Sequence, residues 1–242
     1  MSGDPMFEVE QKFRLPDPAA FLKRVAEIGL SWTKKVAEID TYFQHPSRDF
    51  VQTDEALRIR RHLTFFFGDL EKTHPECRSE EVPDRVEAEQ YITFKGPRLD
   101  RQTKIRKELE LPLAVRTPLD PARFADLFSL SAETLWEQLE ALEALSVSRQ
   151  WMEMLTLLGF RSVRDVRKVR SKAYWEWEGA RVEFSFDEVA PIGTFAELEF
   201  IAENDSELAS VRERLLRLSE FLGLTEVEPR SYLALVAGSE ET

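Results

Sequence analysis

The segment Phe7-Glu8-Val9-Glu10-Gln11-Lys12-Phe13 alternates apolar and polar side chains along a single short run. Successive side chains of a β-strand point to opposite faces of a sheet, so residues two apart share a face. The alternation puts the charged residues on one face and the apolar residues on the other: Glu8, Glu10 and Lys12 against Phe7, Val9 and Phe13. The run therefore predicts a strand with one buried apolar face and one charged face.

Six further segments repeat this alternation. Their charged faces carry Arg58 and Arg60; Lys95; Arg106, Glu108 and Glu110; Lys168 and Arg170; Glu183 and Asp187; and Glu197 and Glu199. Each strand alone fits the solvated side of an ordinary antiparallel sheet. The seven together favour another interpretation, because solvated faces normally also contain Ser, Thr, Asn and Gln. We expect the charged faces to line the inside of a curled sheet, where each charge must meet an opposite charge, a metal or a polyanion.

The wider pattern predicts an α+β protein. Strand-like segments are expected around 6–14, 36–44, 55–63, 88–96, 103–113, 163–178, 180–189 and 194–202. Helices are expected over 17–29, 131–145 and 204–222, with shorter ones beginning at Asp120-Pro121 and near 149–158 and 231–237. The short turn Glu178-Gly179 between two strands requires antiparallel pairing.

The chain is predicted to be a single domain over residues 1–242, since no linker or internal repeat divides it. The ranges 68–90 and 114–150 look like insertions on the sheet. The first is acidic and contains two prolines, which is typical of a solvated loop.

Composition narrows the chemistry. The chain has 242 residues, 43% of them apolar, and 33 Lys and Arg against 45 Asp and Glu give a net charge of −12. This charge argues against nucleic acid or an anionic membrane as a partner. No stretch resembles a signal peptide or reaches the ~18 apolar residues of a membrane span, and a single cysteine, Cys77, fits a cytoplasmic setting.

The scarcity of cysteine and histidine limits the metal chemistry. Besides Cys77 there are three histidines (His45, His62 and His74), which we expect at the surface because none belongs to the charged faces above. Any metal must then be held by carboxylates, which favours Mg²⁺ or Mn²⁺. No glycine-rich phosphate loop is present, so phosphate binding would fall to Lys and Arg, which fork onto phosphate oxygens.

The segment Glu8-Val9-Glu10-Gln11-Lys12 resembles the ExExK motif of the CYTH superfamily, the triphosphate tunnel enzymes. That family includes class IV adenylyl cyclases, thiamine triphosphatases and inorganic triphosphatases. Further segments are similar to the family in the same order along nearly the whole chain: Asp40–Phe43, Ala56–Arg60, Thr93–Pro97, Arg106–Glu110, Leu158–Phe160, Lys168–Tyr174, Asp187–Val189, Gly193–Glu199 and Ser231–Leu233. The resemblance implies a closed antiparallel β-barrel of eight strands, with helices packed outside.

The resemblance also implies roles. It makes Glu8, Glu10 and Glu199 metal ligands, and it makes Glu197 and Asp187 residues that support these ligands or bind a second ion. The triphosphate-binding cations would be Lys12, Arg58, Arg60, Lys95, Lys168 and Arg170. Glu108 and Glu110 would orient these cations or contribute to the metal site, and Arg106 would support the cations. Lys95, Lys168 and Tyr42 are the candidates for a direct part in catalysis, and the general base is not identified.

Among the branches of the family, the motifs of this sequence resemble those of the class IV adenylyl cyclases most. We therefore expect conversion of ATP to cyclic AMP and pyrophosphate with Mg²⁺ or Mn²⁺. Hydrolysis of thiamine triphosphate or tripolyphosphate on the same site is the alternative, and a non-catalytic sensor of nucleotide or polyphosphate is the third. The partner is a small triphosphate in each case, and a homodimer is left open.

Overall fold

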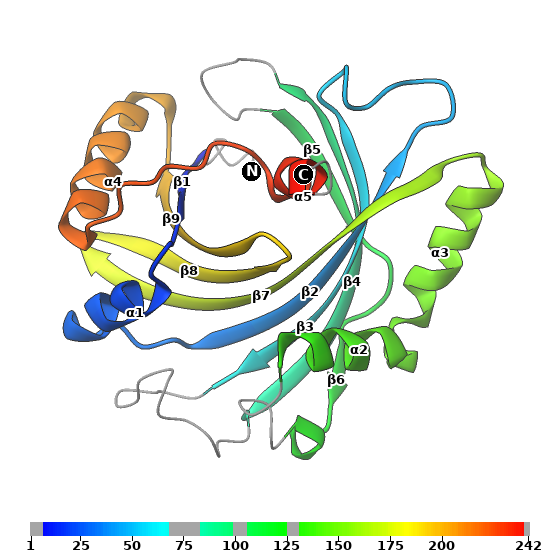
Figure 1. Ribbon diagram of the computed structural model, residues 1–242, viewed down its shortest axis with the longest axis horizontal. Coiled ribbons are helices and arrows are strands. Elements are labelled where there is room, and N and C mark those ends of the chain that lie inside the picture. Colours follow the sequence, from blue (N-terminus) through cyan, green and yellow to red (C-terminus); the bar gives the residue numbers. More distant parts are fainter. Residues whose placement is uncertain (1–6, 68–82, 99–105, 125–130, 240–242) are drawn as a thin grey trace. The chain divides into compact units, whose positions relative to one another are not determined.

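The computed structural model describes residues 7–67, 83–98, 106–124 and 131–239. Its strands belong to one nine-stranded sheet. They are β1 (Phe7–Arg14), β2 (Lys34–Gln44), β3 (Ala56–Phe66), β4 (Arg85–Arg98), β5 (Arg106–Pro112), β6 (Thr117–Leu119), β7 (Arg161–Trp177), β8 (Ala180–Ala190) and β9 (Gly193–Ala202) (Figure 1). All eight expected strands are confirmed, and β6 was not expected.

The helices lie where the sequence predicts them, except that the single helix expected over 131–145 ends at Ala141 and is followed by a separate 3₁₀ turn. They are α1 (Pro18–Glu27), α2 (Ala132–Ala141), α3 (Ser146–Leu157), α4 (Leu208–Leu222) and α5 (Tyr232–Ser239), with 3₁₀ turns at Pro121–Phe124, Glu143–Leu145 and Asp205–Glu207. Asp17 caps α1, accepting a hydrogen bond of 3.0 Å from the backbone N–H of Ala20. Gly223 ends α4 in the left-handed conformation, with φ of 72°. The α+β class is therefore confirmed.

Among the described residues the sheet does not close into a barrel, so the prediction of a closed barrel was wrong. Hydrogen-bonded strands follow the order β1-β9-β8-β7-β2-β3-β4-β5, with β6 paired to β4, and the terminal strands β1 and β5 are not paired with each other there. The outer edge of β1 meets a different segment instead. Arg14 N–H donates to the carbonyl of Glu226, and Glu228 N–H donates to the carbonyl of Lys12, each at 2.8 Å. Strand count and alternation did not reveal which segment would cover this edge.

Contacts divide the chain into two compact units. Unit 1 consists of Met1–Lys35, Phe66–Glu80 and Val169–Thr242, and unit 2 of Val36–Phe65 and Glu81–Lys168. The long strands β2 and β7 contribute residues to both. The expectation of a single domain stays a prediction.

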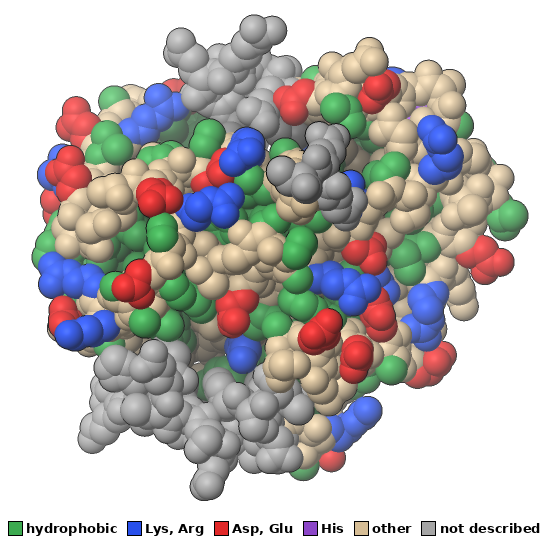
Figure 2. Space-filling view, viewed as in Figure 1, with side chains coloured by type: hydrophobic (Ala, Val, Ile, Leu, Met, Phe, Trp, Pro, Cys, Tyr) green, Lys and Arg blue, Asp and Glu red, His purple; other side chains and the backbone are tan. Residues whose placement is uncertain are grey.

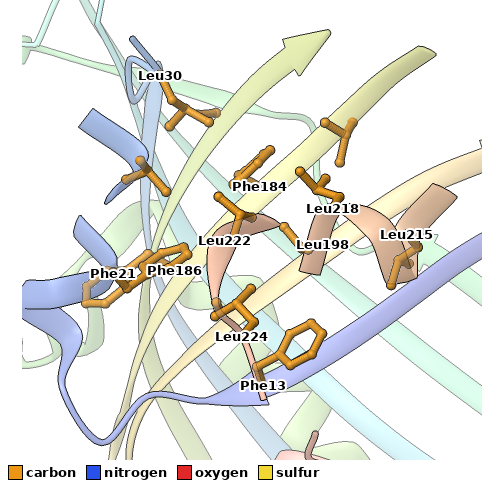
Figure 3. Packing of buried hydrophobic residues seen from close by; sticks show 14 of the residues in the cluster. Phe13, Phe21, Leu30, Phe184, Phe186, Leu198, Leu215, Leu218, Leu222 and Leu224 are labelled. Atoms are coloured by element: carbon orange, nitrogen blue, oxygen red, sulfur yellow. The ribbon is translucent and has the colours of Figure 1, made fainter. Parts of the chain in front are cut away.

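The core of unit 1 lies between its strands and two helices. Helix α4 packs on β9 and β1, and α1 packs beside α4. Figure 3 shows Phe13, Phe184 and Leu198 of the strands facing Leu215 and Leu218 of α4. The apolar side of α4 is therefore buried, and it covers the apolar face of these strands. Their charged face is left for the site.

Unit 2 has its own apolar core. Phe43, Leu57 and Ile59 of β2 and β3 are buried with Leu155 of α3. The sheet and the range 114–150 are joined by Gln90, whose side chain donates to the carbonyl of Ala144 at 3.0 Å and accepts from the N–H of Ser148 at 2.6 Å.

The two expected insertions have different outcomes. In the first, residues 68–82 lie outside the described residues, and the expected loop was wrong at its end, because Arg85–Gln90 belong to β4. The second, 114–150, supplies β6 and helix α2 and buries Leu135, Leu139 and Leu145. This range is thus part of the packing of unit 2. No helix among the described residues is long and apolar enough to cross a membrane.

Candidate functional site

The charged face of unit 2 centres on Arg60, which is held by two buried carboxylates of β2. Arg60 Nε and Nη2 each lie 2.7 Å from an oxygen of Asp40, and Nη2 also lies 2.8 Å from Glu38 Oε1. Arg58 Nη1 donates to Asp40 Oδ2 at 3.0 Å, and Lys168 Nζ lies 3.0 Å from Glu38 Oε1. We call these five residues the Arg60 cluster. It brings together three of the predicted phosphate-binding cations on two shared carboxylates.

The net field in the Arg60 cluster is positive. Burial acts to raise the pKa of Glu38, but the attraction of Arg60, Lys168, Arg58 and His62 outweighs burial and holds this pKa well below its usual range. Burial also opposes the charge of Arg60, yet Asp40 and Glu38 raise its pKa above the ordinary value. Arg60 therefore stays charged at neutral pH, and Glu38 stays ionised beside it.

Tyr42 borders this cluster. Its hydroxyl oxygen accepts a long hydrogen bond of 3.5 Å from Arg58 Nη1. Burial and then the charge of Asp40 raise its pKa. The hydroxyl therefore keeps its proton at neutral pH and is suited to donate a hydrogen bond.

A second pair of strands holds Lys95. Lys95 and Glu108 face each other across β4 and β5, with Nζ 2.8 Å from Oε2. Glu110 Oε2 accepts from the hydroxyl of Thr93 at 2.8 Å and lies 3.8 Å from Arg58 Nη2. Both glutamates thus lie beside predicted cations. Arg106 begins β5, but its side chain lies outside the described part of the chain.

The charged face of unit 1 contains a second forked arginine. Arg170 of β7 donates from Nε and Nη2 to the two oxygens of Asp187, at 2.6 and 2.5 Å, and Nη2 also donates to Glu197. The hydroxyl of Tyr232 donates to Asp187 Oδ2 at 2.5 Å. Asp187 is fully buried, and both its oxygens are bound to these two side chains. This arrangement fixes the orientation of Arg170.

Beside it, three glutamates form a row across neighbouring strands. Glu199 of β9 is directly opposite Glu10 of β1 on one side and Glu183 of β8 on the other. Like charges placed opposite each other destabilise a sheet. Burial, then Glu8, Glu183 and Glu10, raise the pKa of Glu199 to about 7. We call Glu8, Glu10, Glu183 and Glu199 the glutamate row. The net electrostatic field at Glu199 in this row is negative.

Lys172 is the cation next to this row, with Nζ 2.6 Å from Glu183 Oε1. Its attraction for Glu199 is smaller than the repulsion from the other carboxylates. A divalent cation bound by carboxylates would remove this repulsion. Although the donor chemistry thus suits Mg²⁺ or Mn²⁺, no three acidic, His or Cys side chains among the described residues already stand in a metal-binding arrangement.

Lys12 lies at the end of β1 under the C-terminal segment. It is 6% exposed, and Nζ donates to the carbonyl of Arg230 at 2.5 Å. The same Nζ lies 4.0 Å from the centre of the Tyr232 ring. In the strand register Lys12 is opposite Glu197, which precedes Glu199 of the glutamate row by two residues and lies on the same face of β9. Lys12 therefore lies near Arg170 and its carboxylates.

Sequence reasoning missed the residues that hold the cations. Glu38 and Asp40 alternate along β2 with buried apolar residues, so the signal used for the other strands was present there too. The pairing of Asp187 with Tyr232 joins residues 45 positions apart and left no such signal. The expected surface position of His62 was wrong: its side chain is 15% exposed and lies 3.0 Å from Glu89.

The face of the molecule in Figure 2 does not mark the site. Figure 2 shows Lys and Arg side chains next to Asp and Glu on the face in view, without a large area of one sign. The notable charges are instead the buried ones, such as Asp187, Asp40, Glu38 and Lys12.

Comparisons with known proteins agree with this arrangement of strands and motifs. A curated protein of Methanocaldococcus jannaschii named "Putative adenylate cyclase MJ0240" is 26% identical over 232 residues, which are 95% of this chain and 98% of the relative. The solved structure of the PH1819 protein from Pyrococcus horikoshii is 29% identical, covers 96% of this chain and 99% of that chain, and has a TM-score of 0.62.

A third similar protein, from Vibrio parahaemolyticus, supports the fold alone. This solved structure, described as a "putative adenylate cyclase", is 20% identical, covers 96% of this chain and 98% of that chain, and has a TM-score of 0.54. A family model also matches: residues 6–232 match the CYTH domain. Because this match spans nearly the whole chain, the protein belongs to the CYTH domain family.

Proposed function

We propose that this protein is a divalent-metal-dependent enzyme that acts on a small triphosphate. The observation that carries the proposal is the opposite field at two glutamates: positive at Glu38 and negative at Glu199. A positive field favours an anion, and a negative one favours a cation. A metal–triphosphate complex supplies both. The two sets of residues also belong to one ordered series of family motifs, and on that ground we assign them to one substrate.

In this proposal the cations bind the phosphate oxygens. Arginine forks and lysine ammonium groups are the side chains suited to this task. They are Lys12, Arg58, Arg60, Lys95, Lys168 and Arg170. The forked arginines, Arg60 and Arg170, are already oriented by their carboxylates, so little side-chain entropy is lost when phosphate arrives.

Glu8, Glu10 and Glu199 would hold the metal, with Glu197 next to them. The contacts of Asp187 favour a role in positioning Arg170 over that of a ligand. When bound, Mg²⁺ or Mn²⁺ would supply neutralisation of phosphate charge. Because Glu199 has a pKa of about 7, binding of the metal would release a proton over the neutral range.

The reaction we propose is the conversion of ATP to cyclic AMP and pyrophosphate. The name of the Methanocaldococcus jannaschii relative and the class IV cyclase style of the motifs support this choice. The ribose 3′-hydroxyl attacks the α-phosphorus, and pyrophosphate leaves. Reactions of this kind need positioning and charge stabilisation more than a covalent intermediate. Tyr42, which keeps its proton, would donate a hydrogen bond to the substrate, and Lys95 and Lys168 would stabilise developing phosphate charge.

The test is incubation of the purified chain with ATP, thiamine triphosphate and tripolyphosphate, each with Mg²⁺ or Mn²⁺. Formation of cyclic AMP and pyrophosphate in equal amounts is the expected result. Release of orthophosphate would select a triphosphatase instead. Binding of all three compounds without turnover would contradict an enzyme of either kind.

The site assignment needs a separate variant. Lys95→Ala should lower turnover at least about 100-fold, a typical loss for one charge-stabilising group. Lys23→Ala, on α1 away from the charged faces, is the matched control and should keep wild-type turnover. Unchanged turnover of Lys95→Ala would remove Lys95 from the site.

A further inference from the structure

The proposed reaction needs a group that accepts the proton of the attacking hydroxyl, and Tyr42 is unsuited to that task. His62 is a better candidate by position. It follows Arg58 and Arg60 on β3 at spacings of two, so the three side chains share one face of the strand. Its side chain is 15% exposed. This face is the one that forms the Arg60 cluster.

One nitrogen of His62 is fixed by a carboxylate of the neighbouring strand. Nε2 lies 3.0 Å from Glu89 Oε2. A carboxylate only accepts hydrogen bonds, so Nε2 must carry the proton. The hydrogen bond from His62 lowers the pKa of Glu89; burial opposes this, Tyr91 and Arg116 add to it, and the resulting pKa is about 2. Glu89 is therefore ionised at any working pH.

Glu89 is itself held in place from two other directions. Its Oε1 accepts from the hydroxyl of Tyr91 at 2.8 Å and from Arg116 Nε at 2.7 Å. The Tyr91 ring also meets the imidazole edge-on, with 5.7 Å between centres. A base that is oriented by a fixed carboxylate is the arrangement that recurs in nucleophile activation.

The second nitrogen of His62 is left available. Nδ1 makes no hydrogen bond to any residue in the described ranges. In the neutral ring with Nε2 protonated, Nδ1 carries the lone pair and can accept a proton. The ring is also close enough to Glu38 to act on its charge, and Glu38 binds Arg60 and Lys168. His62 thus lies on the same face of β3 as Arg58 and Arg60, two of the cations to which we assign the phosphate groups.

From this arrangement we propose that His62 is the general base of the reaction and that Glu89 is the residue that positions it; this inference rests on the proposed function. Nδ1 takes the proton of the 3′-hydroxyl as the bond from O3′ to the α-phosphorus forms. The bond from the α-phosphorus to the oxygen that bridges to the β-phosphate breaks, and pyrophosphate leaves with its electron pair. The imidazolium stays paired with Glu89 and then gives its proton to water.

The variant His62→Gln tests this step. General-base catalysis typically contributes 10²- to 10⁴-fold, so kcat should fall by about 100-fold or more while KM stays within about twofold. Added imidazole should restore part of the turnover of His62→Ala. His45→Gln is the matched control, because His45 packs on Phe160 and Phe50 and has no carboxylate partner in the described residues.

The pH profile separates a base from a residue that only joins two strands. The groups that face His62 are Glu89 and Tyr91 of β4, Glu38 of β2, Arg60 on its own strand, and Arg116 through Glu89. A general base acts in its deprotonated form, so wild-type kcat should rise with pH and then level off. His62→Gln should lose this rise, and Glu89→Gln should shift it. Thermal unfolding checks that each variant is folded.

The outcomes also distinguish this inference from the proposed function. A wild-type enzyme that turns over a triphosphate, with a His62→Gln variant whose kcat stays within about threefold and keeps the pH profile, would overturn the role of His62 alone. A loss confined to KM, or the absence of rescue by imidazole, would do the same. No turnover by the wild type with any of the three triphosphates would overturn both.

Discussion

Glu38 and Glu199 are the same side chain, each on the charged face of a strand, and their pKa values move in opposite directions. Glu38 belongs to unit 2, where Arg60, Lys168, Arg58 and His62 outweigh burial and lower its pKa. Glu199 belongs to unit 1, where burial and three other carboxylates raise its pKa to about 7. The difference lies in the neighbours, which cross-strand pairing supplies. Alternation alone predicts a charged face but not its sign.

This contrast explains why we assign different ligands to the two faces. In unit 2 three phosphate-binding cations share Glu38 and Asp40, and the net field at Glu38 is positive, so an added anion is attracted there. In unit 1 the glutamate row repels itself, so an added cation relieves a cost already present in the folded chain. Stability and ligand binding should therefore respond in opposite ways to mutation of the two faces.

The largest effect is expected from Arg60→Ala. Glu38 and Asp40 would both lose their main partner, and breaking a buried ion pair typically costs about 3–5 kcal/mol of the free energy of unfolding. Triphosphate turnover should fall at least about 100-fold. Urea unfolding and turnover measure the two effects.

Arg60→Lys is the matched variant, since it keeps the charge and loses the fork. It should fall between the wild type and Arg60→Ala in both measurements. A loss of less than about 1 kcal/mol in Arg60→Ala would mean that water replaces the arginine there, and that the positive field at Glu38 comes from elsewhere.

The next effect has the opposite sign. Glu199→Gln should stabilise the metal-free protein at pH 8 by about 2 kcal/mol, since one pKa unit corresponds to about 1.4 kcal/mol and partial exposure reduces the full value. The folded pKa is raised above the ordinary value, so the contribution of protonated Glu199 is present below about pH 4.5 and is lost as pH rises through about 7. The gain of the variant should therefore shrink towards acid pH.

The stabilisation of the protein by added metal is a second test of Glu199. The wild type should be stabilised by Mg²⁺ or Mn²⁺ more at pH 8 than at pH 6, because the ligand form of Glu199 is the ionised one. Glu199→Gln should lose most of this response and its turnover. Glu220→Gln, an exposed change on α4, serves as the control. Equal stabilisation of wild type and Glu199→Gln by metal would place the metal elsewhere.

A smaller effect is expected from Tyr232→Phe. The ring over Lys12 is kept, and the hydrogen bond from the hydroxyl to Asp187 is lost. The free energy of unfolding should fall by about 1 kcal/mol, the usual net value of one hydrogen bond. Turnover should fall less than tenfold, because the fork of Asp187 on Arg170 remains. A larger loss of turnover would give the hydroxyl a direct part in the reaction.

The smallest effect is expected from Arg217→Ala. Arg217 forks onto Glu178 with distances of 2.9 and 2.6 Å, much as Arg170 forks onto Asp187. Here, however, the pair is exposed to solvent, where ion pairs contribute little. Thermal unfolding should show no measurable change. A clear destabilisation would mean that fork geometry, and not burial, sets the strength of these pairs.

Local structure followed from the sequence where local rules apply. Asp17 caps α1 and Gly223 ends α4, as the capping preferences of these residue types predict, and the run from Phe7 to Phe13 forms a strand with the expected faces. The pairing of strands could not be derived in the same way. The row of Glu10, Glu199 and Glu183 exists because three strands come into register, and no spacing along the chain shows that register.

His62 shows a different kind of failure. Its spacing from Arg60 matches the rule that selects the other residues, but the charged faces were defined by Lys, Arg, Asp and Glu alone, so His62 was expected at the surface. Its function depends on Glu89, 27 positions away on the next strand. Alternation therefore identifies a residue such as His62 only when every polar side chain on the face is considered as a site candidate, and not the charged ones alone.

The segment 226–228 has a consequence for handling this protein. It occupies the outer edge of β1 through hydrogen bonds from Arg14 to Glu226 and from Glu228 to Lys12. A chain shortened before Glu226 would expose this edge, and exposed strand edges are templates for association between copies. Truncation at the C-terminal end should therefore promote aggregation as well as release Lys12 from Arg230. An affinity tag at the C-terminal end should be attached through a spacer, so that segment 226–228 can still cover the edge of β1.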